Sequence, residues 1–320
     1  MGLKVLVTGC TGLVGHGICV HLLRQGHLVW GTSRGAIESR YGRFTAVELD
    51  VASEASVSAL GDLVGDMDAV IHNAALIPAM AKEVTHAWEA FFEVNALGTY
   101  RMLEIAKRVR CFVYISGTAL IQGDNLPITE ESRYSPGSDY LSSKIAGELA
   151  CEQFVRTEKM RVATLRFPAP YGYVGMAGAV IPRFVAAAKA GEDLTLWGSG
   201  GREQVFTFVE DVGLACELAI RANTTGVFNV AGVESISMKG LAETVLRTYP
   251  ESGSRIVFAD QPDPLEGQRA TVSIAKARRE LGFEPRYTLE AGLRRIRDAD
   301  KGAEVRFFGQ PAREMAKGGV

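Results

Sequence analysis

The sequence lacks three features that would direct it to a particular class of protein: an excess of one charge, a long apolar run, and paired cysteines. Thirty-five Lys and Arg residues oppose 37 Asp and Glu residues, so nucleic acid is not an expected partner. Charge, His or Pro interrupts every apolar stretch before the roughly 18 residues that a transmembrane helix needs. We therefore expect no membrane partner either.

The five cysteines are scattered, odd in number and without a CxxC motif. This pattern predicts reduced thiols, a cytoplasmic protein and no metal site. The N-terminus runs directly into a strand pattern, which leaves no room for a signal peptide. An apolar fraction of 47% is ordinary for a globular chain and excludes a fibrous or disordered one.

Short β-branched runs alternate with helical patterns through the first half of the chain. We predict strands at 4–8, 28–32, 45–49, 68–72, 111–116 and 161–166, and helices at 13–25, from 53, at 87–108 and at 139–159. This order predicts the α/β class, with a Rossmann-type doubly wound parallel sheet and ligands outside the carboxyl ends of its strands. We assign 1–166 to a dinucleotide-binding domain and 167–298 mainly to a smaller, irregular substrate lobe. One strand and helix of that lobe return to the sheet, and 299–320 form a tail that ends in disorder.

A glycine-rich turn, TGCTGLVG at 8–15, follows the first strand and begins a helix. A pyrophosphate must reach backbone N–H groups at a helix N-terminus, and a Cβ atom would hold it away. Gly9 permits the tight turn, Gly12 the close approach, and Gly15 the packing of helix on strand. The alternative is a turn that binds no ligand. The predicted cofactor contacts here are Gly9, Thr11, Gly12, Leu13, Val14 and Gly15.

The second strand ends without the carboxylate that accepts from both ribose hydroxyls of NAD. Ser33 and Arg34 stand there instead, and a guanidinium and a hydroxyl suit the 2′-phosphate of NADP. We therefore favour NADP as cofactor, with NAD as the alternative; Arg34 as a solvated loop residue is the other interpretation. Asp50, with Val51, follows the third strand and is placed to accept from the adenine amino group, unless it caps a helix.

Tyr140 and Lys144 form a YxxxK pair on a predicted helix, where the i, i+4 spacing places both side chains on one face. A Tyr that acts as a base near pH 7 needs its pKa lowered by about 3 units, or ~4 kcal/mol. An ammonium ~4 Å away supplies about that much at an effective dielectric of ~20. Tyr140 is then the acid/base that exchanges a proton with a substrate oxygen, beside a nicotinamide that carries the hydride. A solvated surface pair is the alternative.

Two further polar residues are placed to support this pair. Thr118, at the end of the fifth strand, is expected to hydrogen-bond the reacting oxygen. Asn95 is expected to anchor a water molecule or a backbone group behind Lys144, or else to be a merely polar helix position. His72 and His86 have no partner pattern, and we interpret them as structural.

Several segments together resemble the extended short-chain dehydrogenase/reductase family, in its NAD(P)-dependent epimerase/dehydratase group. They include VIHNAA (70–75), VNALGT (94–99), VYISGTALIQG (113–123), YLSSK (140–144), LRFPAPYG (165–172), FVEDV (208–212) and KARRELGFEP (276–285), besides the glycine-rich turn. The resemblance implies Thr118, Tyr140 and Lys144 as the catalytic Ser/Thr-Tyr-Lys set. It further implies cofactor contacts at Asn73, Ala74, Ala75, Asn95, Ser116, Phe167 and Ala169. A homodimer packed through the helices at 87–108 and 139–159 is also implied.

The chain departs from this family's pattern at the substrate side. Ala119 and Leu120 stand where 4,6-dehydratases place an Asp-Glu pair, which argues against elimination of water. Ala169 replaces an Asn, and Gln204 an Arg that holds the substrate phosphate, in enzymes that act on nucleotide sugars. The predicted substrate contacts are Thr118, Ile181, Arg202, Gln204 and Arg269, of which the two arginines are the candidates to replace the missing one.

Three functions remain open at this point. An epimerase would oxidise a hydroxyl of a sugar or nucleotide sugar and return the hydride to the other face. A reductase would consume NADPH on a ketone or aldehyde of a different small molecule. A non-catalytic NADP-sensing protein would keep the turn and lose the proton-transfer group. The pair Tyr140 and Lys144 disfavours the last, and we lean towards epimerisation of a nucleotide sugar.

Overall fold

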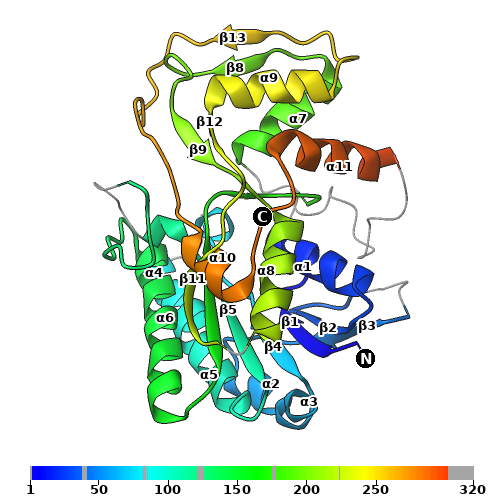
Figure 1. Cartoon of the computed structure of the whole chain (residues 1–320), viewed down its shortest axis with the longest axis vertical. Helices are drawn as coiled ribbons and strands as arrows, with labels where there is room; N and C mark the ends of the chain where they lie inside the picture. The colour runs from blue at the N-terminus through cyan, green and yellow to red at the C-terminus, as the bar shows by residue number, and fades with distance from the viewer. Residues whose placement is uncertain are drawn as a thin grey trace.

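We describe the fold from a computed structural model, which describes residues 2–37, 42–81, 84, 86–120, 126–174, 178–222 and 224–301. A parallel sheet of seven strands forms the larger lobe, in the order β11-β6-β5-β4-β1-β2-β3 (Figure 1). Its strands are β1 (Lys4–Thr8), β2 (Leu28–Ser33), β3 (Phe44–Glu48), β4 (Ala69–His72), β5 (Cys111–Gly117), β6 (Val162–Phe167) and β11 (Gly226–Asn229). The predicted α/β class and doubly wound sheet are confirmed.

The strands are apolar on both faces because helices cover both. In β1, Val5 and Val7 enter one apolar cluster, whereas Leu6 between them enters the other. Val5 and Val7 share their cluster with residues of α1 (Leu13–Arg24), α8 (Val209–Arg221) and α10 (Ala275–Leu281). Leu6 shares its cluster with residues of α2 (Glu54–Ser58), α3 (Gly61–Gly65), α5 (Gly98–Ile105) and α6 (Asp139–Thr157).

The strand order reverses at β1. From β1 the chain runs outward through β2 and β3 on one side, and through β4, β5 and β6 on the other. The crevice at the carboxyl ends of β1 and β4 is therefore the topological switch point, where sheets of this kind bind ligands. The segments that follow these two strands are the glycine-rich turn and residues 73–75.

The predicted helix at 87–108 is wrong in two respects. It consists of α4 (Ala87–Phe91), a π-helical stretch (Phe92–Leu97) and α5, and it ends at Ile105. The wide π turn contains Asn95, whose side chain bonds to neighbouring segments. The chain leaves the helix early because Arg110 already donates its backbone N–H to Asp68 beside β5.

The smaller lobe lies above the sheet in Figure 1. It contains α7 (Val180–Ala190), α9 (Met238–Thr248) and α11 (Leu289–Lys301), with strand pairs β8 (Leu194–Leu196) and β13 (Ile256–Phe258), and β9 (Glu203–Val205) and β12 (Ser235–Ser237). A further pair, β7 (Pro170–Tyr171) and β10 (Thr207–Phe208), lies between β6 and α8 in the chain. β11 is the strand that returns to the sheet, beside β6. α11 continues through residue 301 into the predicted tail, and 302–320 lie outside the described residues.

The five cysteines are buried and none is in a disulfide. Within the described ranges, no helix has the length and apolarity to cross a membrane. Over the same part of the chain, no cluster of three or more His, Cys, Asp or Glu side chains is arranged to hold a metal ion.

Candidate active site

The three glycines of the turn meet different constraints. A Cβ atom on Gly9, whose φ is +65°, would lie 2.9 Å from Cα of Ala74, and one on Gly15 would lie 2.2 Å from the carbonyl oxygen of Gly9. On Gly12 it would meet only that same oxygen, at 3.5 Å, which is ordinary contact. No side chain caps the N-terminus of α1, where Gly12 lies. The fold therefore requires Gly9 and Gly15. At Gly12 the absence of a side chain leaves the backbone N–H groups at the N-terminus of α1 accessible, and a pyrophosphate would fit there.

The loop after β4 is tied to this turn. The backbone N–H groups of Asn73 and Ala74 donate to Thr8 Oγ1 at 3.0 and 2.9 Å, and Asn73 Nδ2 donates to the carbonyl of Gly9 at 3.1 Å. His72 lies buried beside Thr8, with its Nδ1 2.9 Å from Thr8 Oγ1. Burial, aided by the charge of Lys144, lowers the pKa of His72 to about 3. Asn73 and Ala74 thus border the crevice, and His72 is neutral and structural.

The residues predicted to distinguish NADP from NAD and to bind the adenine follow β2 and β3. Arg34 is exposed after β2, while the hydroxyl of Ser33 donates to the carbonyl of Gly35 and so already has an acceptor. Asp50 is exposed, and its Oδ1 accepts from the backbone of Ala52 at 3.0 Å. Its neighbour Val51 is buried in the core. The cap of α2 is Ser53, so the alternative reading of Asp50 as the helix cap is wrong.

Tyr140 and Lys144 lie in the first turns of α6, whose N-terminus Ser138 caps. Gly147 lets this helix approach β5, since a Cβ there would lie 2.3 Å from the hydroxyl of Tyr114. Lys144 is consequently buried against the strand: its Nζ donates to the carbonyl of Ile115 at 2.8 Å and lies 4.2 Å from the centroid of the Tyr114 ring. Tyr140 is half-buried.

The electrostatics of this pair correct one prediction. Burial lowers the pKa of Lys144 to about 8, against the charge of Glu148 one turn later. Burial also raises the pKa of Tyr140, with no opposing contribution from Lys144. The predicted fall in the pKa of Tyr140 is therefore wrong for the protein chain by itself, because burial of the phenol raises it. A cationic ring bound beside the phenol opposes this rise.

The expected supporting residues surround the pair. Asn95 is buried and fixes two segments: its Oδ1 accepts from Leu76 N at 2.8 Å, and its Nδ2 donates to the Leu76 carbonyl at 3.0 Å and to Ser143 Oγ at 3.0 Å. It thus anchors backbone behind Lys144, as expected. Thr118 and Ser116 are buried at the end of β5. Ser116 Oγ has no hydrogen-bond partner among the described residues, which leaves a polar atom open to a ligand.

Sequence reasoning missed a buried ionic network behind this site. Arg166, at the end of β6, and Glu148 on α6 are both less than 5% exposed. Arg166 Nε donates to Glu148 at 3.0 Å, and Tyr134 joins both side chains. The available signal was Glu148 itself, which continues the i, i+4 series of Tyr140 and Lys144 along one helix face.

Of the predicted substrate contacts, Arg202, Gln204 and Arg269 lie on neighbouring segments, since the backbone N–H of Glu203 donates to the carbonyl of Gln268 at 2.9 Å. Arg202 is ion-paired with Asp263 at 3.1 Å, and Arg269 is exposed. Gln204 lies in β9, and Ile181 is buried in the apolar cluster of the smaller lobe. At the end of β6, Phe167 is buried, and the carbonyl of Ala169 accepts from Thr207. The contacts of Ile181, Arg202, Gln204 and Arg269 with a substrate stay predictions. Those of Phe167 and Ala169 with the cofactor stay predictions as well.

Comparison with known proteins gives consistent matches over most of the chain. The model of the NAD dependent epimerase/dehydratase family matches residues 5–231. UDP-glucuronic acid decarboxylase 1 of Danio rerio is 27% identical, over 98% of this chain and 78% of its own length. The structure of epimerase Mth375 from Methanothermobacter thermautotrophicus has a TM-score of 0.82 and 25% identity, and covers 95% of this chain and 94% of its own.

One further structure carries ligands. UDP-glucuronic acid 4-epimerase from Bacillus cereus, in complex with UDP-glucuronic acid and NAD, has a TM-score of 0.79 and covers 93% of this chain and 99% of its own. At 22% identity it establishes likeness of fold alone. The family model, in contrast, covers well over half of the sequence. The chain therefore belongs to the NAD-dependent epimerase/dehydratase family, enzymes of the extended short-chain dehydrogenase/reductase type.

Proposed function

We propose that the chain is an epimerase for a nucleotide sugar or a related sugar, with Tyr140 as its acid/base and a nicotinamide dinucleotide as its hydride carrier. The observation that carries this proposal is the placement of Tyr140 and Lys144 at the carboxyl end of β5. The same edge of the sheet carries the turn at Gly12, where a Cβ would make only an ordinary contact with the carbonyl oxygen of Gly9. Proton transfer and dinucleotide binding thus meet at one switch point.

Several residues fit the cofactor. The N–H groups at the start of α1 suit the pyrophosphate, and the open hydroxyl of Ser116 suits the nicotinamide end. When bound, the nicotinamide supplies hydride transfer. Arg34, exposed where NAD-binding relatives of this fold carry a carboxylate, favours NADP over NAD. NAD stays the alternative, since the Bacillus cereus epimerase was solved with it.

The protein groups have separate tasks in this proposal. Tyr140 takes the proton of a substrate hydroxyl and returns it, and Thr118 donates a hydrogen bond to the same oxygen. Lys144 is positioned by the Ile115 carbonyl and binds the ribose hydroxyls of the cofactor. Its charge and that of the oxidised ring together oppose the rise that burial imposes on the pKa of Tyr140.

The substrate class rests on relatives and on the smaller lobe, which we propose holds the substrate. The Danio rerio and Bacillus cereus relatives are named for UDP-glucuronic acid. Ala119, at the position where dehydratases place an acidic residue, favours epimerisation over elimination. The second candidate is an NADPH-dependent reductase of a ketone or aldehyde that carries no nucleotide. Arg34 favours this candidate, and so does Gln204, which stands where enzymes that act on nucleotide sugars carry an arginine.

One assay distinguishes the two candidates. The purified protein is incubated with NADP or NADPH and a panel of UDP-, GDP- and dTDP-sugars, while absorbance and product sugars are followed. Epimerisation forms a new sugar without net change in NADPH, because the hydride returns to the substrate. Steady consumption of NADPH with a carbonyl compound, and no sugar product, would instead establish the reductase. A protein that binds NADP and turns over nothing would be a sensor.

We also propose a homodimer formed through α4, the π stretch, α5 and α6. Trp88, Leu97, Tyr100 and Leu149 are large apolar side chains on these elements, each 40% or more exposed. Light scattering of the wild type should give twice the mass of one chain. The Leu149→Glu variant should give the mass of a single chain. A monomeric wild type would contradict the proposal. The cytoplasmic location stays a prediction from the absence of cysteine pairing in the sequence.

A further inference from the structure

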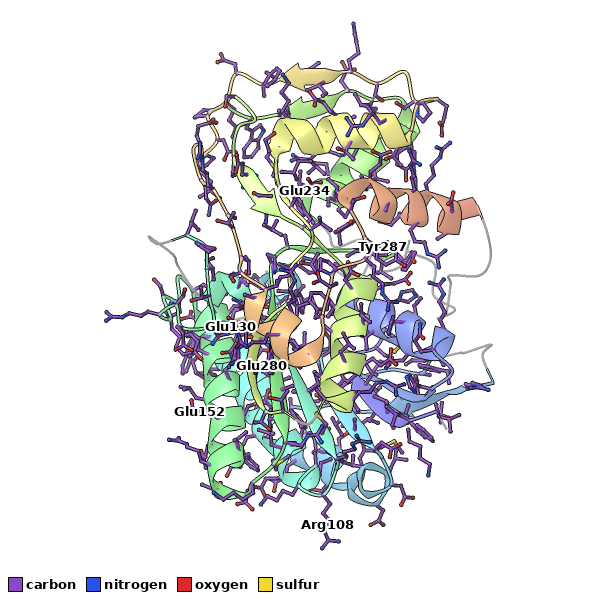
Figure 2. The ribbon with its side chains drawn as sticks, in the orientation of Figure 1. Arg108, Glu130, Glu152, Glu234, Glu280 and Tyr287 are labelled. Atoms are coloured by element: carbon purple, nitrogen blue, oxygen red, sulfur yellow. The ribbon has the colours of Figure 1, made fainter. Side chains whose placement is uncertain are left out.

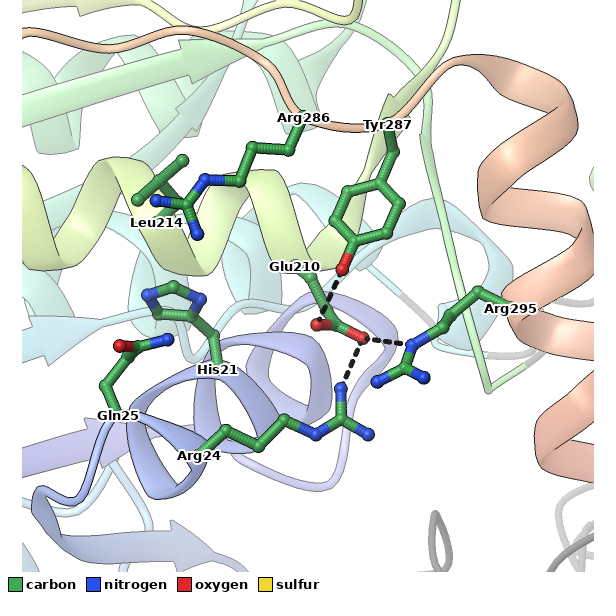
Figure 3. Close-up of a pocket in the computed structure, with 8 residues that line it drawn as sticks. All are labelled: His21, Arg24, Gln25, Glu210, Leu214, Arg286, Tyr287 and Arg295. Atoms are coloured by element: carbon green, nitrogen blue, oxygen red, sulfur yellow. Dashed lines mark hydrogen bonds and ion pairs between the residues drawn. The ribbon is translucent and has the colours of Figure 1, made fainter.

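A small cavity of about 180 Å³ lies where the two lobes meet, away from the residues assigned above to cofactor and substrate (Figure 3). α1 and α8 border it from the sheet lobe, α11 borders it from the smaller lobe, and the segment before α11 closes it. The lining residues are His21, Arg24, Gln25, Glu210, Leu214, Arg286, Tyr287 and Arg295. In Figure 2, Tyr287 marks its position between the lobes.

The one carboxylate of this lining already accepts from four protein donors. Arg24 Nη1 donates to Glu210 Oε1 at 2.7 Å, and Arg295 Nε lies 3.4 Å from the same oxygen. The hydroxyl of Tyr287 donates to Oε2 at 3.2 Å, and that of Tyr173 to Oε1. Glu210 therefore fixes the guanidinium groups of Arg24 and Arg295 in place through Oε1, while its Oε2 accepts from Tyr287 alone.

The cavity keeps a surplus of positive charge. Three guanidinium groups face one carboxylate, and each guanidinium has five N–H donors, more than its bonds to Glu210 use. The side chain of Arg286 makes no hydrogen bond or ion pair with any residue that the structure describes. Burial lowers the pKa of His21, although the Glu217 carboxylate, 2.7 Å from its Nε2, opposes this fall. Asp211, next to Glu210 in the chain, accepts hydrogen bonds from the backbone N–H groups of Arg286 and Tyr287.

We propose that this cavity binds a phosphate-type dianion, either inorganic phosphate or the phosphoryl group of a small metabolite. Planar guanidinium groups match the oxygens of a phosphate, and Arg24, Arg286 and Arg295 approach the same space from three different segments. The volume admits a small anion and excludes a dinucleotide. Because the three arginines belong to both lobes, the bound anion ties the lobes together and stabilises the folded chain by mass action.

The test is calorimetric titration with inorganic phosphate at constant ionic strength, with NAD and NADP in excess so that the glycine-rich turn is covered. The variant is Arg286→Gln, which removes the exposed guanidinium and keeps the backbone bond to Asp211. Arg295→Gln is the second variant. The matched control is Arg108→Gln, an exposed arginine at the opposite end of the molecule (Figure 2). Loss of one of three charged contacts should weaken phosphate binding about tenfold or more.

Saturable binding by the wild type and the control, with at least tenfold weaker binding by both cavity variants, supports the site. Absence of saturable binding by the wild type, or equal affinities in wild type and Arg286→Gln, overturns it. Glycerol 3-phosphate, titrated in parallel, identifies the source. If glycerol 3-phosphate binds as tightly as inorganic phosphate, the site takes the phosphoryl group of a metabolite. If only inorganic phosphate binds, the site takes the free ion.

Discussion

Arg166 and Glu148 form a buried ion pair between the end of β6 and α6, with Arg166 Nε 3.0 Å from Glu148 Oε1. The guanidinium also donates to Tyr134, which in turn donates to Glu148 at 2.8 Å. The pair joins α6, which carries Tyr140 and Lys144, to the end of β6. It therefore fixes α6 against the sheet.

Removal of one member of this pair should destabilise the folded chain. Glu148→Gln leaves the charge of Arg166 buried without its counter-ion, and the free energy of unfolding should fall by about 3–5 kcal/mol. Urea unfolding at pH 7 measures it. The control is Glu152→Gln on the exposed face of the same helix, where a change within about 0.5 kcal/mol is expected. Equal effects of the two substitutions would show that the pair does not stabilise the fold.

The glycines of the turn permit a matched test of the cofactor cradle. Gly12→Ala should leave the free energy of unfolding within about 0.5 kcal/mol of wild type, since the new Cβ meets nothing closer than 3.5 Å. It should weaken dinucleotide binding at least about tenfold, because the methyl group holds the pyrophosphate away. Gly15→Ala should instead destabilise the fold by about 1–3 kcal/mol or more, with its Cβ 2.2 Å from the Gly9 carbonyl.

Urea unfolding and calorimetric titration with NADP and NAD measure the two effects separately. Unchanged dinucleotide affinity in Gly12→Ala would show that no phosphate lies at that position. Preference for NADP is tested in the same titrations with Arg34→Ala, which should weaken NADP far more than NAD. Equal losses would remove the argument for the 2′-phosphate.

His72 should make the protein sensitive to acid. Its pKa is about 3 in the folded chain and about 6.5 when unfolded, so between these values the unfolded state binds the extra proton. Stability therefore falls as pH decreases through this window, and the contribution of His72 between pH 7 and pH 5 is about 2 kcal/mol. His72→Asn removes this titration. Urea unfolding at both pH values should show a smaller loss for the variant than for the wild type.

The exposed His86 provides the control, because its φ of +56° is a conformation that Asn tolerates. His86→Asn should lose the same stability between pH 7 and pH 5 as the wild type. Equal losses in all three proteins would mean that His72 becomes protonated in the folded state as easily as in the unfolded one.

Much of this architecture followed from local patterns. The β-branched run at β1, the glycine-rich turn and the Tyr140–Lys144 spacing each depend on neighbours in sequence, and they placed the strands and α6. The π stretch around Asn95 did not follow, because it is stabilised by bonds to Leu76 and Ser143 that are distant in sequence. The same holds for the hydrogen bond of Lys144 to the Ile115 carbonyl and for the burial of Tyr140, which raises the pKa of its phenol instead of lowering it.

The turnover of Tyr140→Phe tests the central claim most directly. The phenyl ring fills the same space but exchanges no proton, so turnover of whichever substrate the wild type accepts should fall by about 10²–10⁴-fold. Dinucleotide affinity should stay at the wild-type value, and Tyr100→Phe on the surface of α5 should keep full activity. Full turnover by Tyr140→Phe would contradict the account, because the proton would then have to come from another group.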